Sequence, residues 1–235
     1  MKSKNLFLSY IIFFTSLNII ANDEVTIDLG DKNNECKDIT RETLTERYYS
    51  NNFVGTFNGK KIEYTASLKE KIIYEKDDPN LPMASFFYTE YISKDSDQRP
   101  IIFSFNGGPG SASLWLHMGV LGPKVIKVPS DASDDGSPPY NIIDNKLSPL
   151  SDADLVFIDP IGTGYSRAIG CHEGEEFWGV SEDPKIIAEF IRRWITDNKR
   201  WNSPRYILGE SYGGIRGPLL VSELRSGSIT PIEVY

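Results

Sequence analysis

The residues best suited to chemistry form a Gly-Glu-Ser-Tyr-Gly segment, residues 209–213, in which Ser211 lies between two glycines. A short apolar run, residues 205–208, leads directly into this segment, and apolar residues at helical spacing follow it. A serine held in a sharp turn between a strand and a helix exposes its hydroxyl, and the glycines let neighbouring backbone pass without a Cβ clash. Such a serine can attack a carbonyl carbon and form an acyl-enzyme. The alternative is a serine that only caps the helix, and the second motif favours the nucleophile.

The second motif is Asn-Gly-Gly-Pro-Gly, residues 106–110, which also follows an apolar run. A Gly-Gly backbone can turn its N–H groups toward an oxygen that becomes negative in the transition state of acyl transfer. The N–H of Tyr212, directly after Ser211, would supply the other donor. The alternative is an ordinary tight turn, because Gly-Gly and Pro-Gly occur in turns of every kind.

Both motifs need strands to position them, and the apolar pattern predicts those strands. Three short apolar runs, residues 101–105, 155–158 and 205–208, stop at turn residues, which is typical of parallel strands buried on both faces. Earlier in the chain, residues 60–74 alternate with period two and residues 85–92 are rich in β-formers, which predicts antiparallel strands.

One helix is well marked between the second and third apolar runs. Asp183 is suited to be its N-cap and Pro184 its first residue, and apolar residues then recur at helical spacing up to Ile195. The fold class is therefore α/β, with a mostly parallel central sheet behind antiparallel N-terminal strands. Residues 130–150 are expected to form a surface loop.

Composition narrows the class of protein. The 235 residues carry a formal net charge of −8, which argues against a nucleic-acid partner. Two histidines and two cysteines are too few for a zinc ribbon or a disulfide scaffold, and no metal or cofactor is implied.

The N-terminus predicts export. Lys2 and Lys4 precede an apolar stretch that ends at Ala21, so residues 1–21 are expected to be a signal peptide of a periplasmic or secreted protein. An uncleaved anchor or a buried helix is the alternative.

Polar residues 22–55 are expected to form a leader, and residues 56–235 the folded domain. Export would permit a disulfide between Cys36 and Cys171, although two unpaired thiols or pairing outside this chain fit equally well.

Three segments together resemble the serine carboxypeptidase family: residues 106–113, residues 157–166 (Phe-Ile-Asp-Pro-Ile-Gly-Thr-Gly-Tyr-Ser) and residues 209–214. The likeness covers residues 57–224. It implies an α/β-hydrolase fold, expected to be incomplete at the C-terminus of this chain, and an enzyme that releases single residues from peptide C-termini.

The resemblance also assigns roles to individual residues. Ser211 would be the nucleophile, and the N–H groups of Gly108 and Tyr212 the oxyanion hole. Asn106, the Gly107 N–H and Glu210 would bind the terminal carboxylate of a peptide substrate. Two carboxylates can pair there only if one of them holds a proton, which favours an acidic working pH.

The sequence departs from the family pattern at three places. Val120 stands where the family usually has a glutamate that joins the carboxylate-binding set, and Ser111 stands where a cysteine often follows the Gly-Pro-Gly turn. The residues after Ser211 contain neither Asp nor His, although a triad on this fold runs Ser, Asp, His in chain order.

The third departure predicts that this chain is the N-terminal part of a longer protein, with the catalytic Asp and His beyond Tyr235. His117 and His172 are then expected to be ordinary histidines, and Asp159 to organise a turn. An acyltransferase or hydroxynitrile lyase on the same scaffold, and a non-catalytic remnant, are the alternative functions. Side-chain preference and oligomeric state stay open.

Overall fold

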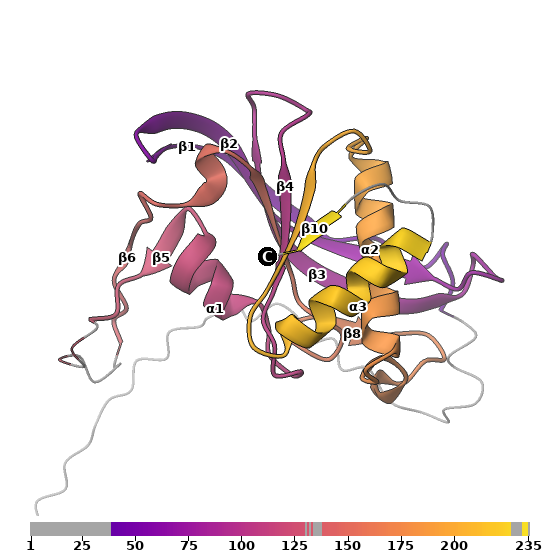
Figure 1. Cartoon of the computed structure of the whole chain (residues 1–235). Helices are drawn as coiled ribbons and strands as arrows, with labels where there is room; N and C mark the ends of the chain where they lie inside the picture. Colours follow the sequence, from indigo (N-terminus) through magenta and orange to yellow (C-terminus); the bar gives the residue numbers. More distant parts are fainter. Residues whose placement is uncertain (1–38, 130, 132, 134–137, 227–231, 235) are drawn as a thin grey trace, which may run out of the picture.

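A computed structural model describes residues 39–129, 131, 133, 138–226 and 232–234. Within these residues the chain forms a large mixed sheet, a small two-stranded sheet and helices on both faces of the large sheet (Figure 1). The strands are β1 Tyr48–Phe57, β2 Lys60–Tyr74, β3 Pro82–Ser93, β4 Ile101–Phe105, β5 Lys124–Ile126, β6 Ile142–Asp144, β7 Asp154–Ile158, β8 Arg167–Ala168, β9 Arg205–Gly209 and β10 Ile232–Val234. The helices are α1 Leu114–Leu116, continued by a π-helical turn His117–Leu121, the 3-10 turns Pro149–Ser151 and Gly174–Phe177, α2 Glu182–Asp197 and α3 Gly213–Ser226.

The large sheet has the strand order β1-β2-β3-β7-β4-β9-β10, with β8 paired to β3. The first three strands are antiparallel to one another, and β3 is antiparallel to β7. Strand β4 lies at the centre and pairs in parallel with β7 on one side and with β9 on the other. This is the predicted class, a mostly parallel centre behind antiparallel N-terminal strands, and it is the arrangement of an α/β-hydrolase.

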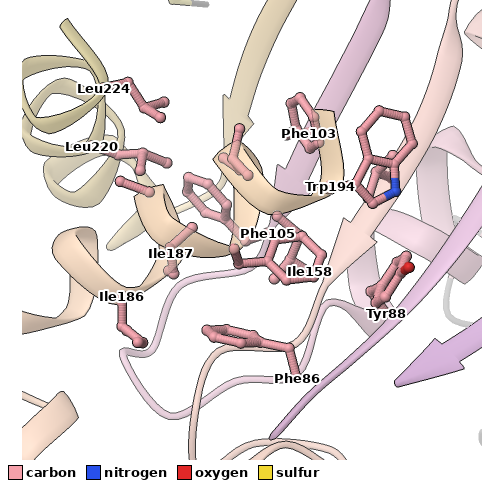
Figure 2. Close-up of a cluster of buried hydrophobic side chains, with 14 of the residues drawn as sticks. Phe86, Tyr88, Phe103, Phe105, Ile158, Ile186, Ile187, Trp194, Leu220 and Leu224 are labelled. Atoms are coloured by element: carbon pink, nitrogen blue, oxygen red, sulfur yellow. The ribbon is translucent and has the colours of Figure 1, made fainter. Parts of the chain in front are cut away.

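Apolar side chains cover both faces of the sheet, as the uninterrupted apolar runs of its central strands predict. On one face, Phe103 and Phe105 of β4 pack with Ile187 and Trp194 of α2 and with Leu220 of α3 (Figure 2). On the other face a smaller cluster joins the start of the sheet to α1 and the 3-10 turn at residues 149–151. This two-sided burial holds the carboxyl ends of β4, β7 and β9 at one edge, from which the two motif loops emerge.

The structure differs from the sequence-based expectations in three elements. Residues 48–55, assigned to a polar leader, are part of β1, whose side chains are almost all exposed and therefore carry no burial pattern. Residues 142–144, expected in a surface loop, pair with residues 124–126. Helix α2 starts at Glu182, so Asp183 is not its cap, and the Asp183 side chain is instead paired with Arg216.

The predicted signal peptide, residues 1–21, lies outside the described residues, as does Cys36. Within the described ranges no helix has the length and apolar character needed to cross a bilayer.

Candidate active site

Ser211 lies in the tight turn between β9 and α3, at the carboxyl edge of the sheet. Its backbone has φ +58°, a left-handed conformation that non-glycine residues rarely adopt and that strains the chain. The turn is closed by the Gly213 N–H, which donates to the Glu210 carbonyl at 2.8 Å, and by the Gly214 N–H, which donates to the Ser211 carbonyl at 2.8 Å. Ser211 is exposed at the tip of this turn, as the nucleophile interpretation predicts.

Gly209 is needed at this turn because the chain folds back on itself. A Cβ at residue 209 would lie 2.5 Å from the Gly213 carbonyl oxygen, which is closer than real Cβ atoms come to any backbone atom. The first glycine of the motif therefore permits the sharp return of the chain into α3.

The loop that follows β4 lies directly against the serine turn. A Cβ at Gly107 would be 2.4 Å from the Tyr212 backbone nitrogen and 2.6 Å from the Glu210 carbonyl oxygen. The loop is closed on itself by the Ser111 N–H, which donates to the Gly107 carbonyl at 3.1 Å. Strands β4 and β9 are neighbours in the sheet, and the two motifs, about 100 residues apart in sequence, are therefore in contact.

The N–H groups of Gly108 and Tyr212 are free to act as donors. Neither donates a hydrogen bond to any residue within the described ranges, and Gly108 is exposed at the tip of its turn. Two free donors beside an exposed serine are what an oxyanion hole requires.

Asn106 and Glu210 come together at the same edge. The Asn106 side-chain amide donates to a Glu210 carboxylate oxygen at 3.1 Å. Asn106 is fully buried, and its amide oxygen accepts from the Leu116 N–H at 3.0 Å, so α1 fixes the orientation of the amide. Glu210 is exposed, so its carboxylate can be reached from solvent.

Arg216, in the first turn of α3, is a site residue that the sequence analysis missed. Its guanidinium is 1% exposed, donates to the Asn106 carbonyl at 2.7 Å and donates through Nε to Asp183 at 2.6 Å. Burial raises the pKa of Asp183, while the charge of Arg216 opposes that rise. No sequence spacing indicates this pair, because its members lie 33 residues apart on different helices.

Asp159, expected to organise its own turn, instead joins two loops that are distant in sequence. It accepts from the Ser113 N–H at 2.8 Å, and burial raises its pKa while this hydrogen bond opposes the rise. The bond ties the end of β7 to the loop that follows β4.

Both histidines are engaged with partners other than Ser211. His117 Nε2 lies 2.6 Å from the Tyr91 hydroxyl, its ring stacks on Phe157, and burial lowers its pKa to about 4. His172 contacts Glu176 through Nδ1 at 2.8 Å and Glu75 through Nε2 at 2.9 Å. Burial lowers the pKa of His172, but the hydrogen bonds to the two carboxylates outweigh burial and raise the pKa overall.

Neither histidine bonds to the Ser211 hydroxyl, which makes no hydrogen bond in the part of the chain that the structure describes. Across that same part, no group of His, Cys, Asp and Glu is placed to hold a metal ion. Cys171 is disulfide-bonded, and the predicted partner, Cys36, lies outside the described residues.

Comparison with known proteins identifies a family. The sequence profile of the serine carboxypeptidase family matches residues 72–230, which include both motifs. Among curated relatives, the chain is 29% identical over 145 residues to serine carboxypeptidase-like 9 of Arabidopsis thaliana, covering 61% of this chain and 32% of that protein. It is 27% identical over 147 residues to serine carboxypeptidase-like 5 of the same plant, with the same coverage. The chain therefore spans about a third of the length of these relatives.

Solved structures give distant matches. A predicted CIB-like hydrolase from Thermoplasma acidophilum superposes with a TM-score of 0.37 at 20% identity, covering 72% of this chain and 62% of that one. A peroxisomal alpha-beta-hydrolase from Saccharomyces cerevisiae superposes with a TM-score of 0.39 at 9% identity, covering 80% of this chain and 43% of that one. The family profile matches more than half of the chain, and the strained serine turn contacts a Gly-Gly loop. This chain therefore belongs to the serine carboxypeptidase family.

Proposed function

We propose that the protein is a serine-type carboxypeptidase in which Ser211 attacks the carbonyl of the last peptide bond. The N–H groups of Gly108 and Tyr212 stabilise the oxyanion of the tetrahedral intermediate. The intermediate then collapses to an acyl-enzyme and releases the C-terminal residue as a free amino acid, and water hydrolyses the ester in a second step.

The observation that carries the proposal is the position of the Asn106–Glu210 pair. The Asn106 amide donates to Glu210, and Glu210 is the residue directly before the nucleophile. A substrate carboxylate at the exposed Glu210, with the buried Asn106 amide and the Gly107 N–H as donors behind it, would place the last peptide bond over Ser211. Glu210 can join that contact only if the two carboxyl groups share a proton, because two carboxylates in contact repel each other.

A general base is also required, because the Ser211 hydroxyl is a weak nucleophile without one. His117 is held by Tyr91 and Phe157, and His172 by Glu75 and Glu176, so neither supplies that base in the arrangement described. We propose that the Asp and His of the triad come from beyond residue 235.

One observation favours a second candidate function, an acyltransferase or hydroxynitrile lyase on this scaffold. The family glutamate that joins the carboxylate-binding set is replaced here by Val120, which is exposed at the end of the π-helical turn and cannot bind a carboxylate. Recognition of the free C-terminus then rests on Asn106, Gly107 and Glu210 alone.

The test compares matched peptides that end in a free acid or in an amide. Incubation of the full-length protein, followed by mass spectrometry, is expected to show stepwise loss of single residues from the acids and little change in the amides. Equal turnover of both forms would contradict carboxypeptidase activity, because the enzyme would then not require a free C-terminus. Absence of turnover with either form would also contradict it and would favour the second candidate. The Ser211→Ala protein is the control for contaminating peptidases.

A further inference from the structure

A cavity of about 290 Å³ lies beside the loop that carries Gly108 and has no role in the mechanism above. Two residues of that loop, Pro109 and Gly110, form part of its wall. The other walls come from the loop after β7, residues 160–163, and from Phe177 and Trp178. Asp183 and Arg216 complete the lining. The volume is close to the lower end of the range for ligand pockets, about 300 Å³, which suits one side chain rather than a whole ligand.

The walls are apolar, and one of them is an indole held in place. The Trp178 Nε1 donates to the Ile161 carbonyl at 3.3 Å, while 54% of the residue is exposed. An exposed aromatic ring fixed by a hydrogen bond offers a contact surface at little cost in side-chain entropy. Together with Ile161 and the prolines, it gives the cavity an apolar side that an aromatic ring can contact.

The polar side of the cavity is the buried Arg216–Asp183 pair. Arg216 uses Nε on Asp183 and Nη1 on the Asn106 carbonyl. Within the described ranges, Arg216 Nη2 and the second carboxylate oxygen of Asp183 make no hydrogen bond. The pair thus keeps the Nη2 amino group of Arg216 and one carboxylate oxygen of Asp183 for a ligand. The positive charge of Arg216 and the negative charge of Asp183 offset each other. A charged ligand group would lose its water there without gaining a counter-ion, so the cavity favours an uncharged group.

We propose that this cavity is a specificity pocket for an uncharged aromatic side chain of the substrate, and that it prefers tyrosine to phenylalanine. The proposal rests on the proposed function, which places the substrate backbone along residues 106–108. The ring lies against Trp178, and the phenolic hydroxyl exchanges hydrogen bonds with Asp183 and Arg216. A site that hydrogen-bonds a substrate hydroxyl discriminates against the analogue that lacks it, because its own polar groups are then left unpaired.

The test measures binding rather than turnover. Isothermal titration of the full-length Ser211→Ala protein would use N-acetyl dipeptide acids with tyrosine, phenylalanine or alanine at either position. Tyrosine at one of the two positions is expected to bind about 10- to 200-fold more tightly than alanine there. Trp178→Ala should reduce this gain to about 2-fold, whereas Trp201→Ala, an exposed tryptophan outside the cavity, should leave it unchanged.

Asp183→Asn tests the polar side of the cavity. It should lower the ratio of tyrosine affinity to phenylalanine affinity to about 1. The ratio is compared because loss of the partner of buried Arg216 also disturbs Asn106, to which Arg216 donates, and so weakens the binding of both peptides. The proposal would be overturned if peptides with tyrosine and with alanine bound equally well at both positions. It would also be overturned if the Trp178→Ala protein still bound the tyrosine peptide as much more tightly than the alanine peptide as the protein with Trp178 does. Dipeptide amides binding as well as the acids would instead count against the carboxypeptidase function and leave the pocket intact.

Discussion

The two ends of the parallel strands each bury a charged pair, and the pairs are built differently. At the amino ends, Asp154 is fully buried and accepts from the Ser93 N–H, from Arg99 and from Arg200. Arg200 also donates to Ser203 and to the Arg99 carbonyl, so both partners are enclosed by hydrogen bonds. At the carboxyl ends, Arg216 donates to Asp183 and to the Asn106 carbonyl, and the pair lines a cavity.

The difference separates a structural network from a functional one. A buried pair whose hydrogen bonds are all made inside the protein can only hold the fold together. A pair that keeps a free donor and acceptor at a cavity can also bind a ligand. The left-handed φ of Ser211 does not by itself distinguish the carboxyl edge, because Lys199, next to Arg200 at the other edge, has φ +57°. What distinguishes Ser211 is that it is exposed and lies beside free backbone donors. Substitutions at the two edges should therefore separate stability from activity.

The largest effect is expected from Ser211→Ala. Loss of the nucleophile should lower kcat/KM of the full-length protein for free-acid peptides by about 10⁴-fold or more. The thermal midpoint should hardly change, because the hydroxyl makes no hydrogen bond with the described residues. Steady-state kinetics and calorimetry measure both quantities. Retained hydrolysis would show that another residue is the nucleophile.

Asp154→Ala should have the opposite profile. It leaves the Arg200 charge buried without its partner, so the free energy of unfolding should fall by about 3–5 kcal/mol in urea titrations. The kcat/KM of the folded fraction should stay unchanged, because Asp154 lies at the far end of the strands. Asp152→Ala is the matched control, since its pair with Lys60 is exposed and should contribute less than about 1 kcal/mol. A loss of kcat/KM in folded Asp154→Ala would break the contrast between the edges.

Gly107→Ala should affect the carboxyl edge through the backbone. The added Cβ would lie 2.4 Å from the Tyr212 nitrogen, so one of the two loops must move and the oxyanion donors lose their alignment. We expect a fall in kcat of about 10²- to 10³-fold, the usual effect of losing one oxyanion donor. Gly214→Ala is the control, because nothing lies within 4 Å of its added Cβ. Equal activity of both variants would contradict the contact between the motifs.

The smallest effects concern the histidines, which should change stability with pH in opposite directions. His117 has a depressed pKa, about 4, so the unfolded chain binds its proton first and stability is lost as pH falls from about 6.5 toward 4. His172 has a raised pKa, so its contribution is complete below about 6.5 and is lost as pH rises through its folded value.

His117→Gln should therefore remove part of the acid sensitivity. His172→Gln should destabilise the protein mainly at acidic pH. Urea unfolding at several pH values measures both effects. The same pH dependence in the two variants would contradict these assignments.

Much of the fold follows from the sequence because apolar periodicity is a local signal. The ends of β2 and β4 agree with the structure to the residue, and the motifs lie at the strand ends where the Gly-rich turns place them. Strand β1 was missed because its exposed side chains carry no alternation; its place in the sheet comes from pairing with β2.

The site was only partly predictable for a related reason. Ser211, Gly107 and Asn106 belong to local motifs, so residue types and spacing identify them. Arg216 and Asp183 do not, since their pairing depends on how α2 and α3 pack together. An aspartate beside a proline at the start of a helix is typical of a cap, and no local pattern distinguishes a cap from a buried partner.

Covalent labelling of the full-length protein with an organophosphorus fluoride, followed by peptide mapping, shows whether Ser211 is an activated nucleophile. We expect one adduct, on Ser211, that forms on the folded protein and is prevented by denaturation or by Ser211→Ala. Absence of the adduct from the folded full-length protein, or an adduct on another serine that survives Ser211→Ala, would contradict this expectation.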